Sequence, residues 1–177
     1  SPGVPGDHPR LAALASLVPI IGELELGARH CQARTVAITG TNGKTTTTAM
    51  TRGLVERAGR HVVAAGNIGP TLLDTLAAQG DDLPAVWVLE LSSFQLDGVE
   101  GFEPTASTVL NLSEDHLDWH GDMDAYCAAK ARIVGSTGLL VLNRSDARVM
   151  ALQPASEVVK KKKTIEREVA TFGSDAP

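Results

Sequence analysis

Residues 36–47, VAITGTNGKTTT, place a glycine-rich loop directly between an apolar β-type run and a predicted helix. Gly40 and Gly43 let the backbone turn its N–H groups toward a ligand, and the helix that begins at Lys44 adds about half an elementary positive charge at its N-terminus. Lys44 can then reach the outer phosphates of a polyphosphate, and the Thr45 hydroxyl can bind Mg²⁺. The alternative is a plain glycine turn with a solvated lysine. The residues expected to hold the phosphates are Gly40, Thr41, Asn42, Gly43, Lys44, Thr45 and Thr46.

The composition is that of a soluble globular protein. The 177 residues suffice for one well-buried domain, and the 3% aromatic content predicts a core of Ala, Val, Leu and Ile. A net charge of −5 argues against broad electrostatic binding to nucleic acid or to an anionic membrane, so we expect small-molecule ligands. The sequence shows neither a long apolar run nor a signal peptide, which indicates a cytoplasmic protein, expected to be monomeric.

Two cysteines, Cys31 and Cys127, stand without a cluster of metal ligands. This usage is typical of a reducing cytoplasm, and we expect both thiols to be buried. The chain opens Ser1-Pro2-Gly3 without methionine and ends shortly after a possible strand, so we expect a fragment of a longer protein. The run Lys160–Lys163 predicts a solvated charged segment.

Apolar runs and helical patterns alternate along most of the chain. Residues 1–34 predict a loop, a helix at 9–17, a short apolar stretch at 18–21 and a polar helix at 22–31. Beyond them, strands are predicted at 36–39, 61–65, 85–91, 106–112 and 138–143, and helices at 44–58, 70–78, 123–134 and 146–152. This order predicts right-handed βαβ units, hence an α/β fold with a mostly parallel sheet flanked by helices, similar to P-loop NTPases.

Polar residues follow each of the first four predicted strands, at 40–45, 66–69, 90–93 and 111–116. Ligands of parallel α/β sheets bind beyond the carboxyl ends of the strands. We therefore expect these four segments to meet in one crevice.

Glu90 ends the apolar run that begins at Ala85. P-loop proteins place an acidic group in this position, near the Mg²⁺ of the nucleotide. Mg²⁺ prefers hard oxygen ligands and keeps several waters, so Thr45 and Glu90 would suffice from the protein side. The alternative is a strand-end glutamate in a surface ion pair.

His116 lies among acids in the sequence Glu114-Asp115-His116-Leu-Asp118. This density of charge after a strand can serve a second metal, with neutral imidazole as a ligand, or His116 can be purely structural. His120, four residues further on, is expected at the surface.

Lys130 lies in an alanine-rich helix that would bury part of its stem. Burial favours the neutral amine, which can react with carbon dioxide to give an anionic carbamate able to bind magnesium. A snorkelling lysine, or one paired with a nearby glutamate, is the alternative.

With these residues assembled, the chain resembles the Mur ligase family, whose members make the peptide of bacterial cell-wall precursors. The likeness covers about residues 1–146. The LELSSFQL phrase points to the D-glutamate-adding members, whereas the phosphate loop is shared with folylpolyglutamate synthases. Five motifs occur in order, namely GTNGKT at 40–45, GNIG at 66–69, LELSSFQL at 89–96, LNLSEDH at 110–116 and AAKAR at 128–132.

The resemblance implies a reaction in which ATP phosphorylates the terminal carboxylate of UDP-N-acetylmuramoyl-L-alanine and the amine of D-glutamate then attacks the acyl phosphate. It implies catalytic roles for Lys44, His116 and Lys130. It implies one Mg²⁺ on Thr45 and Glu90, and a second on His116 and carbamylated Lys130. Asn67, Ser92 and His116 would line the muropeptide end of the crevice.

The resemblance also implies a division of the chain. Residues 1–34 would be the last part of a UDP-binding N-terminal domain with its linker, and residues 35–177 part of the central ATP-binding domain. Such a fragment is not expected to complete ligation alone. Two alternatives are another Mur ligase or folylpolyglutamate synthase, and a non-catalytic P-loop module that binds nucleotide as a switch or scaffold.

Overall fold

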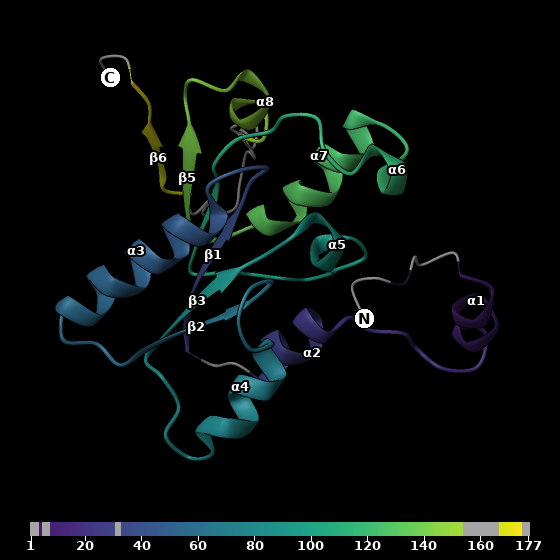
Figure 1. Cartoon of the computed structure of the whole chain (residues 1–177), viewed down its shortest axis with the longest axis horizontal. Coiled ribbons are helices and arrows are strands. Elements are labelled where there is room, and N and C mark those ends of the chain that lie inside the picture. The colour runs from purple at the N-terminus through teal and green to yellow at the C-terminus, as the bar shows by residue number, and fades with distance from the viewer. Residues whose placement is uncertain (1–3, 5–7, 31–32, 154–166, 175–177) are drawn as a thin grey trace, which may run out of the picture.

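A six-stranded, entirely parallel sheet forms the centre of the computed structural model, which describes residues 4, 8–30, 33–153 and 167–174 (Figure 1). Neighbouring strands lie in the order β2-β3-β1-β4-β5-β6. The strands are β1 (Arg34–Thr39), β2 (Val62–Gly66), β3 (Val86–Glu90), β4 (Ala106–Val109), β5 (Leu139–Asn143) and β6 (Val169–Phe172). The predicted α/β class and parallel sheet are confirmed.

Helices connect the strands, and each strand that the sequence predicted is present within a few residues. Two four-residue helices at strand exits, α5 and α6, were not predicted. The helices are α1 (Pro9–Ala15), α2 (Glu23–His30), α3 (Lys44–Arg57), α4 (Leu72–Gln79), α5 (Ser93–Leu96), α6 (Leu117–His120), α7 (Met123–Ala131), the 3₁₀ helix η1 (Arg132–Val134) and α8 (Ala147–Met150).

The two faces of the sheet bury different sets of side chains. Because successive strand residues point to opposite faces, Ile38 packs with Val62 and Val88 on the face that α3 covers through Val55. The neighbouring residue, Ala37, belongs to the larger core on the other face. That core is completed by Leu24 of α2, Leu72 of α4, Leu96 of α5, Tyr126 of α7, Ile133 of η1 and Val149 of α8.

Strand β1 lies in the interior of the sheet, paired with β3 on one side and β4 on the other. Ile38, near its end, is in register with Glu90 of β3 and Thr108 of β4. All strands point the same way, so the loops after β1, β2, β3 and β4 emerge at one edge. The topology therefore places the phosphate loop between the polar segments that follow the other three strands.

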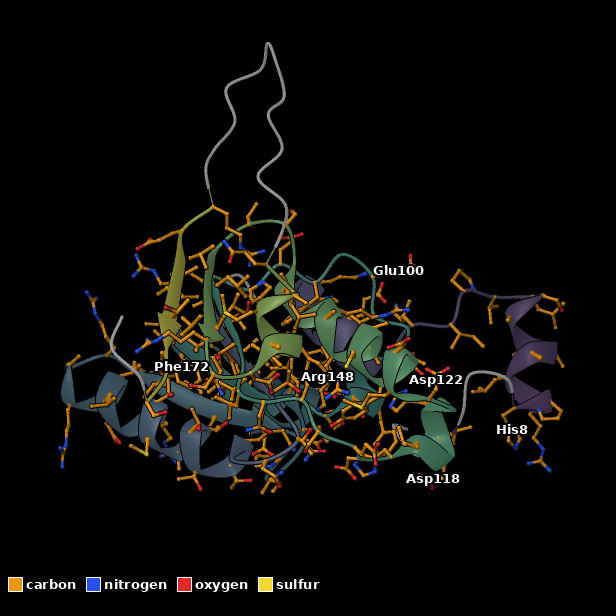
Figure 2. The ribbon with its side chains drawn as sticks, turned by 90° about the horizontal axis from the view of Figure 1, so that it is seen from above. His8, Glu100, Asp118, Asp122, Arg148 and Phe172 are labelled. Atoms are coloured by element: carbon orange, nitrogen blue, oxygen red, sulfur yellow. The ribbon has the colours of Figure 1, made fainter. Side chains whose placement is uncertain are left out.

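The N-terminal helices differ in how they contact the sheet. Helix α2 packs on α4, where Gly27 lies against the Leu72 side chain and Glu23 accepts a hydrogen bond from the Leu73 N–H at 2.9 Å. Helix α1 has no buried residue and stands apart in both views, with His8 labelled at its start (Figure 2).

The two cysteines and the lysine run were also the subject of expectations from the sequence. Cys127 is only half-buried at the border of the core, so the expectation of full burial is wrong for this thiol. Cys31 and the Lys160–Lys163 run lie outside the described residues. Among the described residues, no helix is both long and apolar enough to cross a membrane.

Candidate active site

At two positions, the backbone of the phosphate loop adopts a conformation that favours glycine. Gly43 caps α3 with φ of 83° in the left-handed region, and Gly40 has φ of 152°. A Cβ on Gly40 would lie 3.0 Å from the Leu110 Cβ and 3.3 Å from the Asn111 nitrogen. The loop is thus packed directly against the exit of β4, and α3 begins beneath it with free N–H groups.

Lys44 folds back over its own loop. Its Nζ donates hydrogen bonds to the carbonyl oxygens of Gly40 and Thr41, both at 2.9 Å. The ammonium group therefore sits at the mouth of the phosphate loop, where an anionic phosphate would meet both this charge and the N-terminus of α3.

Glu90 is 2% exposed at the end of β3, and it faces the first turn of α3. The Thr45 hydroxyl donates to its Oε1 at 3.4 Å, and the Asn67 side-chain amide donates to the same oxygen at 3.3 Å. No ion pair to Glu90 is present in the described part of the chain, so the surface-pair alternative fails. A buried carboxylate beside a threonine hydroxyl is an oxygen donor set suited to Mg²⁺.

Lys130, in the last turn of α7, is 2% exposed and its side chain reaches the phosphate loop. Its Nζ donates to the Thr39 hydroxyl at 3.1 Å and to the Gly40 carbonyl at 3.0 Å, and lies 5.0 Å from the centre of the Tyr126 ring. Burial, reinforced by the charge of Lys44, lowers the pKa of Lys130 to about 7. The alternative of a snorkelling or glutamate-paired lysine is therefore wrong.

His116 begins α6 with the left-handed backbone angles φ 53° and ψ 32°, the only non-glycine residue with positive φ among those described. Its Nε2 lies 3.4 Å from an Asp115 carboxylate oxygen, and its ring centroid lies 4.6 Å from that of Phe94. No group of three or more His, Cys, Asp or Glu side chains in the described ranges could hold a metal. A metal at this loop would need further ligands, such as Lys130 as a carbamate and substrate oxygens.

His120, expected at the surface, is only partly exposed. Its ring stacks on Phe94 with centroids 5.9 Å apart and meets Tyr126 edge-on at 5.5 Å. Its Nε2 is buried without a hydrogen-bond partner among the described residues. Burial is the main cause of a lowered pKa for His120, and the charges of His116 and Lys130 act in the same direction, whereas Asp97 and Asp118 oppose it.

These groups surround a cavity of about 260 Å³ at the carboxyl edge of the sheet. Five predicted residues line it, and Thr45 and Glu90 adjoin it through Asn67. Ser92 lines it although its hydroxyl bonds Gln95 in a capping box, which leaves one acceptor lone pair. The expected meeting of the four strand exits is thus confirmed. The lining residues are Lys44, Asn67, Ser92, Ser93, Phe94, Asp115, His116, Tyr126 and Lys130.

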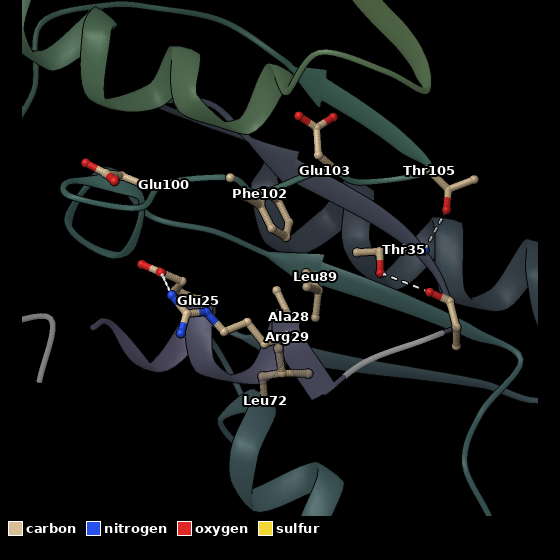
Figure 3. A pocket seen from close by; sticks show the side chains of 12 residues that line it. Glu25, Ala28, Arg29, Thr35, Leu72, Leu89, Glu100, Phe102, Glu103 and Thr105 are labelled. Carbon is tan, nitrogen blue, oxygen red and sulfur yellow. Dashed lines mark hydrogen bonds and ion pairs between the residues drawn. The ribbon is translucent and has the colours of Figure 1, made fainter. Parts of the chain in front are cut away.

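A larger cavity of about 370 Å³ lies elsewhere, between α2 and the segment 100–105 (Figure 3). Leu72, Leu89 and Phe102 contribute apolar surface to it, and the charges of Glu25 and Arg29 in its wall pair with each other. None of the predicted site residues lines this cavity. The larger cavity is therefore not the candidate active site. The smaller one is, because charged and polar side chains converge on it.

Tyr126 and Phe94 were not predicted as functional, and Asn111 was expected only as part of the crevice segment 111–116. Tyr126 donates or accepts a 2.9 Å hydrogen bond with the Thr41 hydroxyl, Phe94 contacts the His116 ring, and Asn111 bonds Asn42 through its side chain. Tyr126 precedes Lys130 by one helical turn, so its spacing could have indicated a shared helix face. Thr46 is exposed on the first turn of α3.

Two features define the class of P-loop nucleotide-binding domains. One is a parallel sheet with a phosphate loop after an interior strand, and the other is a buried carboxylate beside the first turn of the following helix. The family model described as the Mur ligase middle domain matches residues 38–176, which extends the resemblance beyond residue 146. The chain therefore belongs to the Mur ligase family.

Similar proteins carry consistent names. UDP-N-acetylmuramoylalanine–D-glutamate ligase of Albidiferax ferrireducens is 58% identical over 146 residues, 81% of this chain and 29% of the relative. The enzyme of the same name from a Polaromonas species is 54% identical over 174 residues, 97% of this chain. The chain spans 29% of the length of each relative. The crystal structure of MurF ligase from Thermotoga maritima in complex with ADP has a TM-score of 0.64 at 20% identity, covering 86% of this chain and 35% of that one, which shows a shared fold.

Proposed function

We propose that this chain is the ATP-binding centre of a ligase that joins UDP-N-acetylmuramoyl-L-alanine to D-glutamate during the synthesis of peptidoglycan precursors. The observation that carries the proposal is the convergence of Lys44, Lys130 and the Thr45–Glu90 pair on one edge of the sheet. The names of the two relatives support the substrates, and the ADP complex of the T. maritima ligase supports the nucleotide.

The reaction needs ATP because a carboxylate is a poor electrophile. An oxygen of the terminal alanine carboxylate attacks the γ-phosphorus, and the bond to ADP breaks. The amine of D-glutamate then attacks the acyl carbon, loses a proton, and phosphate leaves. Lys44 and the N-terminus of α3 offset the negative charge that gathers on the phosphates, so these groups act mainly by electrostatic stabilisation.

Magnesium ions would supply further positive charge to the phosphates when bound. The Thr45 hydroxyl and the Glu90 carboxylate would provide the hard oxygens for the first ion, and the Asn67 amide holds that carboxylate by a hydrogen bond. Because Asn67 also lines the cavity, it connects this ion site to the proposed muropeptide end.

A carbamate on Lys130 would make a second ion site possible. With a pKa of about 7, a large fraction of Lys130 is neutral near neutral pH. The amine nitrogen attacks the carbon of CO₂, a C–O π bond becomes a C–O⁻ group, and the nitrogen loses one proton to solvent. The product is an anion beside Gly40 in place of an ammonium group, and with His116 it would hold the second Mg²⁺.

The muropeptide end of the cavity is assigned to Asn67, Ser92 and His116, which line it. Ser92 can still accept one hydrogen bond from substrate, since Gln95 occupies its donor and one lone pair. Residues 1–34 are proposed to belong to a UDP-binding domain and residues 35–177 to the ATP-binding domain. The proposed enzyme is a cytoplasmic monomer that acts on small molecules rather than nucleic acid or membranes.

The test uses the full-length protein that contains this chain. Phosphate release from ATP is measured with UDP-N-acetylmuramoyl-L-alanine and D-glutamate, and separately with the acceptors of other Mur ligases and with folate substrates. Release that requires the first pair supports the proposal. Release triggered by another carboxylate substrate identifies a different ligase, and nucleotide-dependent partner binding without any phosphate release would instead indicate a switch.

A further inference from the structure

The phosphate loop is held from outside by the segment that leaves β4. The Leu110 N–H donates to the Thr39 carbonyl at 2.9 Å, and the Thr41 N–H donates to the Asn111 carbonyl at 3.0 Å. Parallel pairing between β1 and β4 thus continues past the strand ends into the loop. A further pair of bonds joins Thr41 and Ser113, at 3.0 and 3.2 Å.

Asn111 adds a two-point side-chain clamp to this contact. Its Oδ1 accepts the Asn42 N–H at 2.8 Å, and its Nδ2 donates to the Asn42 carbonyl at 3.0 Å. Both backbone groups of Asn42, the residue before the αL glycine Gly43, are therefore fixed by one amide side chain. An ionised Asp of the same size could not make both bonds, since it lacks the donor.

The clamp controls a loop whose function depends on its backbone. A phosphate loop binds its ligand through aligned N–H groups, and alignment before binding removes an ordering cost that would otherwise weaken affinity. Asn42 lies on the exposed outer turn of this loop, and within the described part of the chain its hydrogen bonds are the two to Asn111. The clamp also ties the loop to the segment that ends in His116.

From this geometry we propose that Asn111 is a positioning residue for the nucleotide: it presets the phosphate loop from the neighbouring strand exit, without touching the ligand. The inference rests on the proposed function, because it assumes that the loop binds ATP. It predicts that loss of the side chain weakens binding of the phosphates and leaves recognition of the base unchanged.

Asn143 provides a matched control on the next strand. It is also a half-buried asparagine, and its side chain also makes two hydrogen bonds to backbone, to the Leu110 carbonyl at 2.9 Å and from the Ser145 N–H at 3.0 Å. Neither partner belongs to the phosphate loop. Asn143→Ala therefore removes the same number of bonds from the same sheet edge.

The experiment titrates ATP and inorganic tripolyphosphate, each with Mg²⁺, into the full chain and into its Asn111→Ala and Asn143→Ala variants by calorimetry. Removal of two neutral hydrogen bonds from the loop is expected to weaken both ligands about tenfold in Asn111→Ala. Asn143→Ala is expected to leave both affinities within about twofold of wild type. Amide exchange at Asn42 should accelerate only in Asn111→Ala. If that variant does not fold, the near-isosteric Asn111→Leu takes its place.

Suppose that the Asn111 variant has the same melting temperature as Asn143→Ala and binds both ligands with wild-type affinity. That result would overturn the positioning role and leave the proposed function intact. A loss confined to ATP and absent for tripolyphosphate would also overturn it, because the clamp acts on the phosphate loop. A folded wild-type chain that binds neither ligand would overturn the nucleotide site itself, and the inference with it.

Discussion

Lys44 and Lys130 donate hydrogen bonds to the same acceptor, the carbonyl oxygen of Gly40, at 2.9 and 3.0 Å. Two amines from α3 and α7 thus converge on the loop that follows β1. Burial lowers the pKa of Lys130, and the charge of Lys44 lowers it further. An anion bound at this loop would relieve that repulsion, so ligand charge and the protonation of Lys130 are coupled.

Glu90→Gln is expected to weaken Mg²⁺-dependent ATP binding and to leave Mg²⁺-free binding unchanged. The amide keeps the size of the carboxylate but lacks its charge, and loss of a metal contact costs at least about tenfold in affinity. Calorimetry with Mg²⁺ and with a chelator measures both values. The control is Glu100→Gln, an exposed carboxylate that does not line the active-site cavity, and equal behaviour of the two variants would contradict the metal role.

The lowered pKa of Lys130 predicts that the free energy of unfolding rises with pH. Its pKa is about 7 in the fold and near the ordinary 10.5 when unfolded, so between these values the unfolded chain binds more protons. The free energy of unfolding should therefore increase across this window, by about 2 kcal/mol from pH 7 to 9 relative to Lys130→Met. Urea denaturation of both chains in CO₂-free buffer measures the difference. Parallel pH profiles would show that Lys130 is not desolvated as described.

A carbamate on Lys130 is expected in bicarbonate buffer. The reaction needs the neutral amine, so its extent should rise as the pH passes through about 7. With ¹³C-bicarbonate, NMR should show a carbamate carbon in the wild-type chain that is absent from Lys130→Arg, whose guanidinium stays protonated. A spectrum without the signal in both chains would remove the second metal site from the mechanism.

His120→Phe is expected to stabilise the chain by about 1 kcal/mol, because it replaces a buried nitrogen without a described partner and keeps the ring contacts with Phe94 and Tyr126. Since the pKa of His120 is lowered in the fold, wild-type stability should also fall on acidification below the ordinary 6.5, and the variant should lose that component. Thermal melts at several pH values measure both effects. A destabilised variant would mean that the nitrogen is solvated after all.

The sequence predicted the parallel sheet well because apolar runs and glycine-bounded turns alternate regularly from Val36 onward. It also predicted the meeting of Lys44, Asn67 and His116, since residues at parallel strand exits share an edge. The short helix α5 was missed, although Ser92 and Gln95 form a capping box whose spacing is visible in the sequence.

Other features depend on tertiary contacts that no local pattern contains. His120 is half-buried because Phe94 and Tyr126, from two other elements, pack against its ring. The left-handed backbone at His116 begins α6, which no glycine signalled. The clamp between Asn111 and Asn42 spans two strand exits, so only the sheet order places these residues together.

The most direct test of the account is Mg²⁺-dependent ATP binding by calorimetry, comparing the wild-type chain with Lys44→Ala and with Arg52→Ala, which removes an exposed charge from the same helix. Loss of charge-assisted bonds to phosphate is expected to weaken binding at least about tenfold in Lys44→Ala. Arg52→Ala should bind as wild type does. Equal affinities in all three folded chains, or no binding by the wild type, would contradict the assignment of this loop to the nucleotide phosphates.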